Sequence, residues 1–247
     1  MKRILLVIVL GFLNSAVQAQ DSSSTGKMKC CMMNQCGKYR HFGYIGLGYQ
    51  YNQFNGLPSA SFNGSGGLNG GGFALTGNRY IICHRMLFGG EFGGVSTMPT
   101  NNSTASAMVS QAFGFFNFGY LVIDKEEMML YPYVGIGGIF NELRLKNKTN
   151  TDWVESEYTI KAGQKGNFSS AGAGINLGIG FKKTIMPCGS GYAMQIGLDV
   201  GARIAPYKSD WYYDGNYQSI GSFGTADNVS YYARLTIGGG SVKANSK

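Results

Sequence analysis

Residues Tyr192 to Pro206 read Y-A-M-Q-I-G-L-D-V-G-A-R-I-A-P, and their side chains separate into two sets at strict period two. One set is apolar throughout: Tyr192, Met194, Ile196, Leu198, Val200, Ala202 and Ile204. The other set is small and polar, and it contains Gln195, Asp199 and Arg203. A strand directs alternate side chains to opposite sides, so this segment separates two different surroundings. Its apolar side is unbroken for about the ten residues that a tilted strand needs to cross a bilayer, which predicts lipid outside and a narrow lumen inside.

Seven further segments have comparable patterns and are expected to be strands. They cover approximately 41–51, 72–82, 86–95, 107–123, 128–141, 168–182 and 229–240. In the second of them the apolar face changes partway, because Phe73 and Leu75 are out of phase with Tyr80 and Ile82. An extra residue in one strand shifts the alternation in this way, so we expect a β-bulge near Gly77 or Asn78.

The connections between these strands alternate between long and short. The long ones are 52–71, 96–106, 142–167 and 207–228, and the short ones are centred on 83–85, 124–127 and 187–191. The segment 142–167 holds nine charged residues and is expected to lie in water. An even number of strands with this alternation predicts an all-β fold, an eight-stranded antiparallel up-and-down transmembrane β-barrel with short periplasmic turns and long extracellular loops.

The distribution of charge supports a membrane barrel over a soluble sandwich. Charged residues make up only 14% of the chain, and those in the expected strands are Arg79, Glu91, Lys182, Asp199, Arg203 and Arg234. A soluble sheet would carry many charges on its hydrated face. The chain has 39 glycines without a collagen-like period, which fits crowded and curved strands.

The two ends of the chain are expected to lie outside the barrel. We predict a signal peptide over 1–19, because Lys2 and Arg3 are followed by the apolar run 4–13 and by small residues around Ala19. Residues 20–40 are then a Cys- and Met-rich periplasmic tail, 41–240 the barrel and 241–247 a C-terminal tail. Cleavage leaves 19 basic and 13 acidic residues, a net charge of +6. Because these charges are dispersed, we expect outer-membrane lipids as partners and no nucleic acid.

Six polar residues are expected to face the lumen and form a network: Glu91, Lys182, Gln195, Asp199, Arg203 and Arg234. Charges in a confined interior need partners. If Pro206 meets Val229, then Asp199 lies opposite Thr236 and diagonally from Arg234. Eight strands close a barrel that side chains can fill, so we favour a structural network; a gate or a conduction path is the alternative.

Five cysteines are expected on the periplasmic side: Cys30, Cys31, Cys36, Cys83 and Cys188. In an oxidising compartment the expected outcome is disulfides within the tail or from the tail to the turns, with one thiol left over. The alternative is a soft-metal site built by the tail cysteines with Met28, Met32, Met33 and His41. The spacing is not that of a zinc finger, so we predict no bound metal and no cofactor.

Aromatic residues in the long loops are candidates for binding a surface ligand: Trp153, Trp211, Tyr212, Tyr213 and Tyr217. The alternative is that some belong to the interfacial aromatic girdle. That girdle is expected to include Tyr49, Tyr51, Tyr120, Tyr192 and Tyr231. Catalysis is not expected, because the only histidines, His41 and His84, lie on the periplasmic side and the chain contains none of the common hydrolase, metalloprotease or nucleotide-binding motifs.

The strand and loop pattern over 41–240 resembles the small outer-membrane barrels of Gram-negative bacteria, the OmpA transmembrane-domain, OmpX and OmpW-like group. The resemblance implies an integral outer-membrane protein, which we expect to be a monomer. We expect a non-enzymatic protein with a structural or surface-binding role and a side-chain-filled lumen. The resemblance to OmpW-type barrels suggests the alternative, a narrow channel or transporter for small or hydrophobic solutes. A periplasmic metal binder built on the tail is a third hypothesis.

Overall fold

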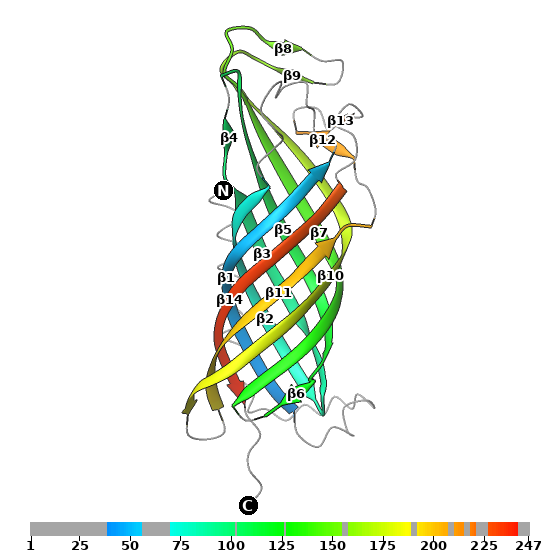
Figure 1. Ribbon diagram of the computed structural model, residues 1–247. Helices are drawn as coiled ribbons and strands as arrows, with labels where there is room; N and C mark the ends of the chain where they lie inside the picture. Colours follow the sequence, from blue (N-terminus) through cyan, green and yellow to red (C-terminus); the bar gives the residue numbers. More distant parts are fainter. Residues whose placement is uncertain are drawn as a thin grey trace, which may run out of the picture. The chain divides into compact units, whose positions relative to one another are not determined.

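The strands close into a barrel (Figure 1). The computed structural model describes residues 39–55, 70–101, 103–125, 127–154, 158–188, 192–206, 210–214, 218–220 and 227–241. Within these ranges, eight long strands pair antiparallel with their neighbours, and the ring is closed by the pairing of the last with the first. They are β1 (Tyr39–Asn55), β2 (Gly71–Cys83), β3 (Met86–Thr97), β5 (Ala105–Tyr120), β7 (Met128–Asn147), β10 (Lys165–Cys188), β11 (Tyr192–Ile204) and β14 (Asp227–Ser241). The predicted eight-stranded antiparallel barrel is confirmed.

The described residues also form six short strands at the two ends of the barrel. They are β4 (Thr100–Asn101), β6 (Ile123–Asp124), β8 (Trp153–Val154), β9 (Thr159–Ile160), β12 (Trp211–Tyr213) and β13 (Gln218–Ile220). β6 lies at the end with the short turns, and the other five lie at the opposite end (Figure 1). No helix of the described residues is long and apolar enough to cross a membrane.

The outer face of the barrel is apolar, and its inner face is polar or aromatic. On β11, Ile196, Leu198 and Val200 are exposed by 40% or more, whereas Asp199 and Arg203 are each 1% exposed. The other strands expose apolar side chains in the same way, among them Leu47, Phe73, Phe116, Ile136, Ile179 and Leu235. Leaving one such side chain in water forgoes about 1.5–3 kcal/mol. A surface of this extent is therefore suited to acyl chains and not to water.

Exposed tyrosines lie near both edges of this apolar surface. Tyr49 and Tyr51 of β1 and Tyr231 of β14 point outward toward the long-loop end, and Tyr120 ends β5 at the short-turn end. Tyrosine favours the boundary between acyl chains and headgroups because its ring is apolar and its hydroxyl is polar. These four are placed as an aromatic girdle requires; the side chain of Tyr192 lies outside the described residues.

The predicted β-bulge near Gly77 or Asn78 is wrong. β2 pairs with β1 and with β3 in an unbroken register from one end to the other. Tyr80 and Ile82 do not return to the lipid face; both are 1% exposed and lie in the lumen. The apolar pattern changes face because the lower lumen is filled with apolar side chains, so the strand itself needs no irregularity.

The number of charged residues in 142–167 indicated a loop, but both ends of this segment are strand. β7 continues to Asn147 and β10 begins at Lys165, and the two pair over this extension. Leu143 and Leu145 point inward while Glu142, Arg144 and Lys146 point outward, so the charged residues alternate with a second apolar core. The charges are in water, as expected, but they lie on an ordered strand.

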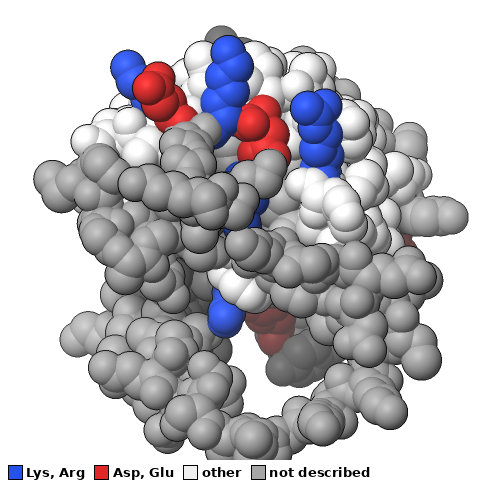
Figure 2. All heavy atoms as spheres, turned by 90° about the horizontal axis from the view of Figure 1, so that it is seen from below, with Lys and Arg blue, Asp and Glu red and all other residues white. Residues whose placement is uncertain are grey.

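The short-turn end carries charged side chains of both signs, as the view from below shows on the part of the surface not covered by grey atoms (Figure 2). An ion pair joins Arg40 at the start of β1 to Asp124 of β6, with Nη2 and Oδ1 2.8 Å apart. The expected signal peptide, the tail up to residue 38 and residues 242–247 lie outside the described residues, and these assignments stay predictions.

Candidate functional site: the filled lumen and the extracellular cap

Inward-facing glycines make room for the large side chains that fill the lumen. A Cβ on Gly201 of β11 would collide with the Leu177 carbonyl oxygen and the Tyr232 hydroxyl, and one on Gly178 of β10 would collide with the Tyr133 ring. Outward-facing Gly90 of β3 differs, because a Cβ there would have nothing within 4 Å. Packing therefore requires the interior glycines. A strand without a side chain at these positions leaves space for an aromatic side chain from another strand.

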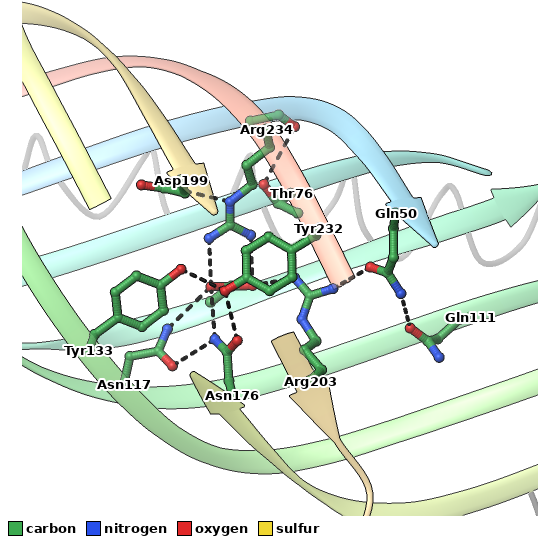
Figure 3. A network of polar contacts seen from close by, with 12 residues as sticks. Gln50, Thr76, Gln111, Asn117, Tyr133, Asn176, Asp199, Arg203, Tyr232 and Arg234 are labelled. Carbon is green, nitrogen blue, oxygen red and sulfur yellow. Dashed lines mark hydrogen bonds and ion pairs between the residues drawn. The ribbon is translucent and has the colours of Figure 1, made fainter. Parts of the chain in front are cut away.

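The centre of the lumen is a carboxylate held by two arginines. Glu91 of β3 accepts hydrogen bonds from Nη1 and Nη2 of Arg234 at 2.7 and 2.8 Å and from Nη2 of Arg203 at 2.7 Å. Figure 3 labels the two arginines. The three side chains are 0%, 1% and 1% exposed. Charges this deeply buried are tolerated only when they are paired and hydrogen-bonded, and here all three are.

A second carboxylate extends this ion-pair group. Asp199 of β11 accepts from Lys182 Nζ at 2.6 Å and from Arg234 Nε at 3.2 Å. Lys182 also donates to Thr236 Oγ1 at 2.6 Å. Arg234 thus bridges the two carboxylates, and four strands, β3, β10, β11 and β14, are tied together across the lumen.

Neutral polar residues surround the charges and extend the network toward the long-loop end. Arg203 Nη1 donates to Gln50 Oε1, and Gln50 donates to Gln111 Oε1 at 2.6 Å (Figure 3). Gln111 then donates to Asn141 Oδ1 at 2.9 Å. Asn141 continues to Ser170 Oγ at 3.2 Å. These side chains leave little room for mobile water at this level, since each is 3% exposed or less.

Tyrosines and asparagines form a second group of neutral partners around Glu91 in the central layer. The Tyr133 and Tyr232 hydroxyls lie 2.7 Å apart, and Tyr232 donates to Asn176 Oδ1 at 2.9 Å. Asn176 and Asn117 each donate to Glu91 Oε2 at 3.3 Å. The Arg203 guanidinium also stacks on Phe113, with its carbon 3.5 Å from the ring centroid, which adds a cation–π contact.

Apolar layers lie on both sides of this polar layer. The layer toward the short turns contains Phe42, Tyr44, Tyr80, Ile82, Leu87, Leu121, Met129, Tyr131 and Tyr133. The layer toward the long loops contains Ala74, Val95, Phe113, Phe115 and Ile139. The lumen is therefore a packed core in the transmembrane region that the described residues form.

The structure places all six predicted lumen residues inside the barrel and brings five of them together. Gln195 lies apart, where it accepts from the Tyr44 hydroxyl and donates to Thr184 Oγ1. The predicted register was wrong by two residues, because Val229 pairs with Ile204 and not with Pro206. Asp199 consequently lies directly opposite Arg234 and not opposite Thr236.

Four neutral members of the network were not predicted from the sequence: Gln111, Asn117, Tyr133 and Asn176. Their alternation with outward apolar residues places Gln111, Asn117 and Asn176 on the inward faces of their strands. Tyr133 has the same signal, because it is out of phase with Val134 and Ile136 on β7. Alternation gives the face of a residue; it does not give its partner across the lumen.

The loop aromatics occupy different positions from one another. Trp211 is 0% exposed, so it is not an exposed binding residue, and its Nε1 has no hydrogen-bond partner among the described residues. It packs in a cluster at the long-loop end, here called the cap cluster, made of Ala105, Ala107, Val109, Leu143, Leu145, Tyr158, Ile160, Phe168, Trp211 and Ile220. Trp153 and Tyr213 pack against this cluster. Tyr212 is 43% exposed, and Tyr217 lies outside the described residues.

Of the five cysteines, only Cys83 has a side chain within the described residues. Cys83, at the end of β2, is disulfide-bonded. The side chains of Cys30, Cys31, Cys36 and Cys188 lie outside the described residues, so the connectivity stays a prediction. No group of three or more potential metal ligands occurs among the described residues.

A closed antiparallel barrel with a lipid-facing exterior and a polar, packed interior is the architecture of outer-membrane proteins. The protein is an integral outer-membrane β-barrel. Its short turns face the periplasm and its long connections face outward, because the start of β1 and the end of β14 lie with the short turns. The cap cluster is therefore extracellular.

Several solved structures of low sequence identity are similar to this chain. No family model and no curated protein matches the chain. Among solved structures, Ail of Yersinia pestis is 8% identical, with 83% of this chain and 98% of that chain covered and a TM-score of 0.43. Neisserial surface protein A is 9% identical (82% and 97%, TM-score 0.42), and a major outer membrane protein from Thermus thermophilus is 11% identical (81% and 98%, TM-score 0.42). The fold of this chain is established by its own strand pairing.

Proposed function

We propose that this protein is a non-conducting, non-enzymatic outer-membrane barrel that anchors an ordered extracellular cap with a structural or surface-binding role. The observation that supports it is the fully buried group of Glu91, Arg203 and Arg234 at the centre of the lumen. An aqueous path would have to pass this level, where water does not reach the side chains.

Opening such a path would require breaking the buried ion pairs. Removing one partner of a buried pair typically destabilises a protein by about 3–5 kcal/mol, because a charge is left uncompensated. Arg234 is shared by Glu91 and Asp199, so its displacement would disturb two carboxylates at once. A thermally accessible gate at this position is therefore unfavourable, and we favour the structural role over the channel alternative.

The extracellular end supports a surface role because it is built as an ordered unit. The extensions of β5, β7 and β10 carry the inner apolar face of the cap cluster. The hairpins β8–β9 and β12–β13 provide Tyr158, Ile160, Trp211 and Ile220 to cover it. Residues such as Val154 and Tyr212 remain exposed on this unit and are available to a surface ligand.

The test is conductance across planar bilayers containing the purified, folded protein. We expect no regular current steps from the wild type or from Asp199→Ala, while a porin in the same bilayers gives steps and shows that the assay works. Steps from the wild type that change amplitude in Asp199→Ala would overturn the proposal and favour the channel.

A further inference from the structure

The outer face of the extracellular extension has a basic surface that begins two rows beyond the last lipid-facing row. Residues on β5, β7 and β10 align across the three strands in rows. Ala112, Phe140 and Ala171 form the last apolar row, and Ser110, Glu142 and Ser169 form the next. The row after that contains Arg144, and the next row contains Lys146 beside Lys165. These three cations are here called the basic face.

Among the described residues, the two lysines of the basic face have no carboxylate partner. Lys146 and Lys165 are exposed and lie directly opposite each other on paired strands, an arrangement that is unfavourable for like charges. Neither pairs with a carboxylate of the described residues. Arg144 is paired with Glu142, with Nη2 and Oε1 2.6 Å apart, so the local excess is carried by the two lysines. An anion between them would remove the repulsion.

The basic face lies within reach of lipid headgroups. A tilted strand rises by about 2.5 Å per residue along the membrane normal. Arg144 and Lys146 are therefore about 10 and 15 Å beyond Phe140, above a headgroup layer that is about 5–8 Å thick on each side of the bilayer. Lysine side chains are long enough to reach back toward phosphates at the boundary.

The lipid-facing surface below Phe140 includes a row of small residues. Gly114, Gly138 and Ala173 form one row across the same three strands, below the row that contains Phe140. A Cβ on Gly114 or Gly138 would meet no atom closer than 4.0 and 3.8 Å, respectively. Packing inside the protein therefore does not require these glycines, in contrast to Gly201. An apolar surface with small residues below a cationic one matches the two halves of a phosphorylated lipid.

We propose that this face of β5, β7 and β10 binds a phosphorylated glycolipid of the outer leaflet. Its phosphates lie between Lys146 and Lys165 with Arg144 nearby, and its acyl chains lie over Gly114, Gly138 and Ala173. This interaction goes beyond the proposed structural or surface role and does not depend on whether the lumen conducts.

Native mass spectrometry of the detergent-solubilised full protein tests the proposal, with lipid A carrying both phosphates as the probe. The variant is Lys146→Gln with Lys165→Gln. The matched control is Lys183→Gln, an exposed lysine at the periplasmic end of the same strand β10. We expect the double variant to retain lipid A about 10- to 30-fold more weakly than the wild type, and the control to be unchanged. Dephosphorylated lipid A should bind as weakly to the wild type as lipid A does to the double variant.

Three results would overturn the proposal. The first is equal retention of lipid A by the wild type and the double variant. The second is displacement of lipid A by inorganic phosphate at equal concentration, which would indicate a site for free phosphate. The third is equal retention of phosphatidylglycerol, which would indicate nonspecific attraction of anionic lipids. Because both lysines are exposed, heat-modifiable gel mobility should show that the variant is folded. Gly138→Leu, which leaves the cations intact, should also weaken binding.

Discussion

Asp199 and Arg234 lie directly opposite each other in the ladder between β11 and β14, and Arg234 Nε donates to Asp199 Oδ2 at 3.2 Å. The same guanidinium binds both oxygens of Glu91 through its other two nitrogens. One side chain therefore connects carboxylates that come from β11 and from β3. The stability of the barrel should depend on this connection more than on any charge at its surface.

Glu91→Gln tests that dependence. The substitution keeps the size of the side chain but leaves Arg203 and Arg234 short of a counter-charge in a buried position. We expect the free energy of unfolding in detergent to fall by about 3–5 kcal/mol, measured by urea titration. Glu142→Gln, which removes the partly exposed pair with Arg144, is the matched control and should change it by less than about 1 kcal/mol. Similar losses from both variants would contradict a special role for the buried pair.

Gly201→Ala and Gly90→Ala test whether the interior glycines are required by packing. At Gly201 the added methyl group would displace the Tyr232 hydroxyl and press on the Leu177 carbonyl. We expect a loss of about 1–3 kcal/mol in the same unfolding assay. Gly90 faces outward with open space, so alanine there should be tolerated. Equal effects would mean that backbone propensity, and not lumen packing, explains the glycines.

Trp211→Ala tests the order of the extracellular cap. Trp211 is fully buried in the cap cluster, so its removal leaves a large cavity and should open the cap without unfolding the barrel. The expected result is rapid proteolysis on the extracellular side at unchanged heat-modifiable mobility. Tyr212→Ala, next in sequence but exposed, should remain as resistant as the wild type. Resistance of the Trp211 variant would show that the cap does not depend on this core.

The sequence predicted the transmembrane part well because lipid imposes a simple rule on it. Outward positions must be apolar, and Ile196, Leu198 and Leu235 follow that rule without exception on their strands. The rule fails where the interior is apolar as well. Tyr80 and Ile82 were read as lipid-facing residues after a bulge because alternation alone cannot distinguish an apolar layer in the lumen from lipid.

The extracellular extension was missed for the opposite reason. From Asn141 to Asn147, leucines alternate with charged residues, but here the apolar side faces inward and the charged side faces water. Charge count indicated a loop, although the period of two was present in the sequence. The partners of Glu91 could not be predicted, because they depend on a register that was wrong by two residues and on distances across the lumen.

The measurement that tests the central claim most directly is quenching of tryptophan fluorescence by phospholipids brominated on their acyl chains. Tyr231 and Tyr232 are adjacent on β14 but are 51% and 5% exposed, respectively. In reconstituted protein, Tyr231→Trp should add fluorescence that the bromines quench, and Tyr232→Trp should add fluorescence that they do not. The signal from Trp153 and Trp211 is common to both variants and is subtracted with the wild type. Equal quenching of the two added tryptophans, or quenching only at position 232, would contradict a barrel whose apolar rows face lipid and whose polar rows fill the lumen.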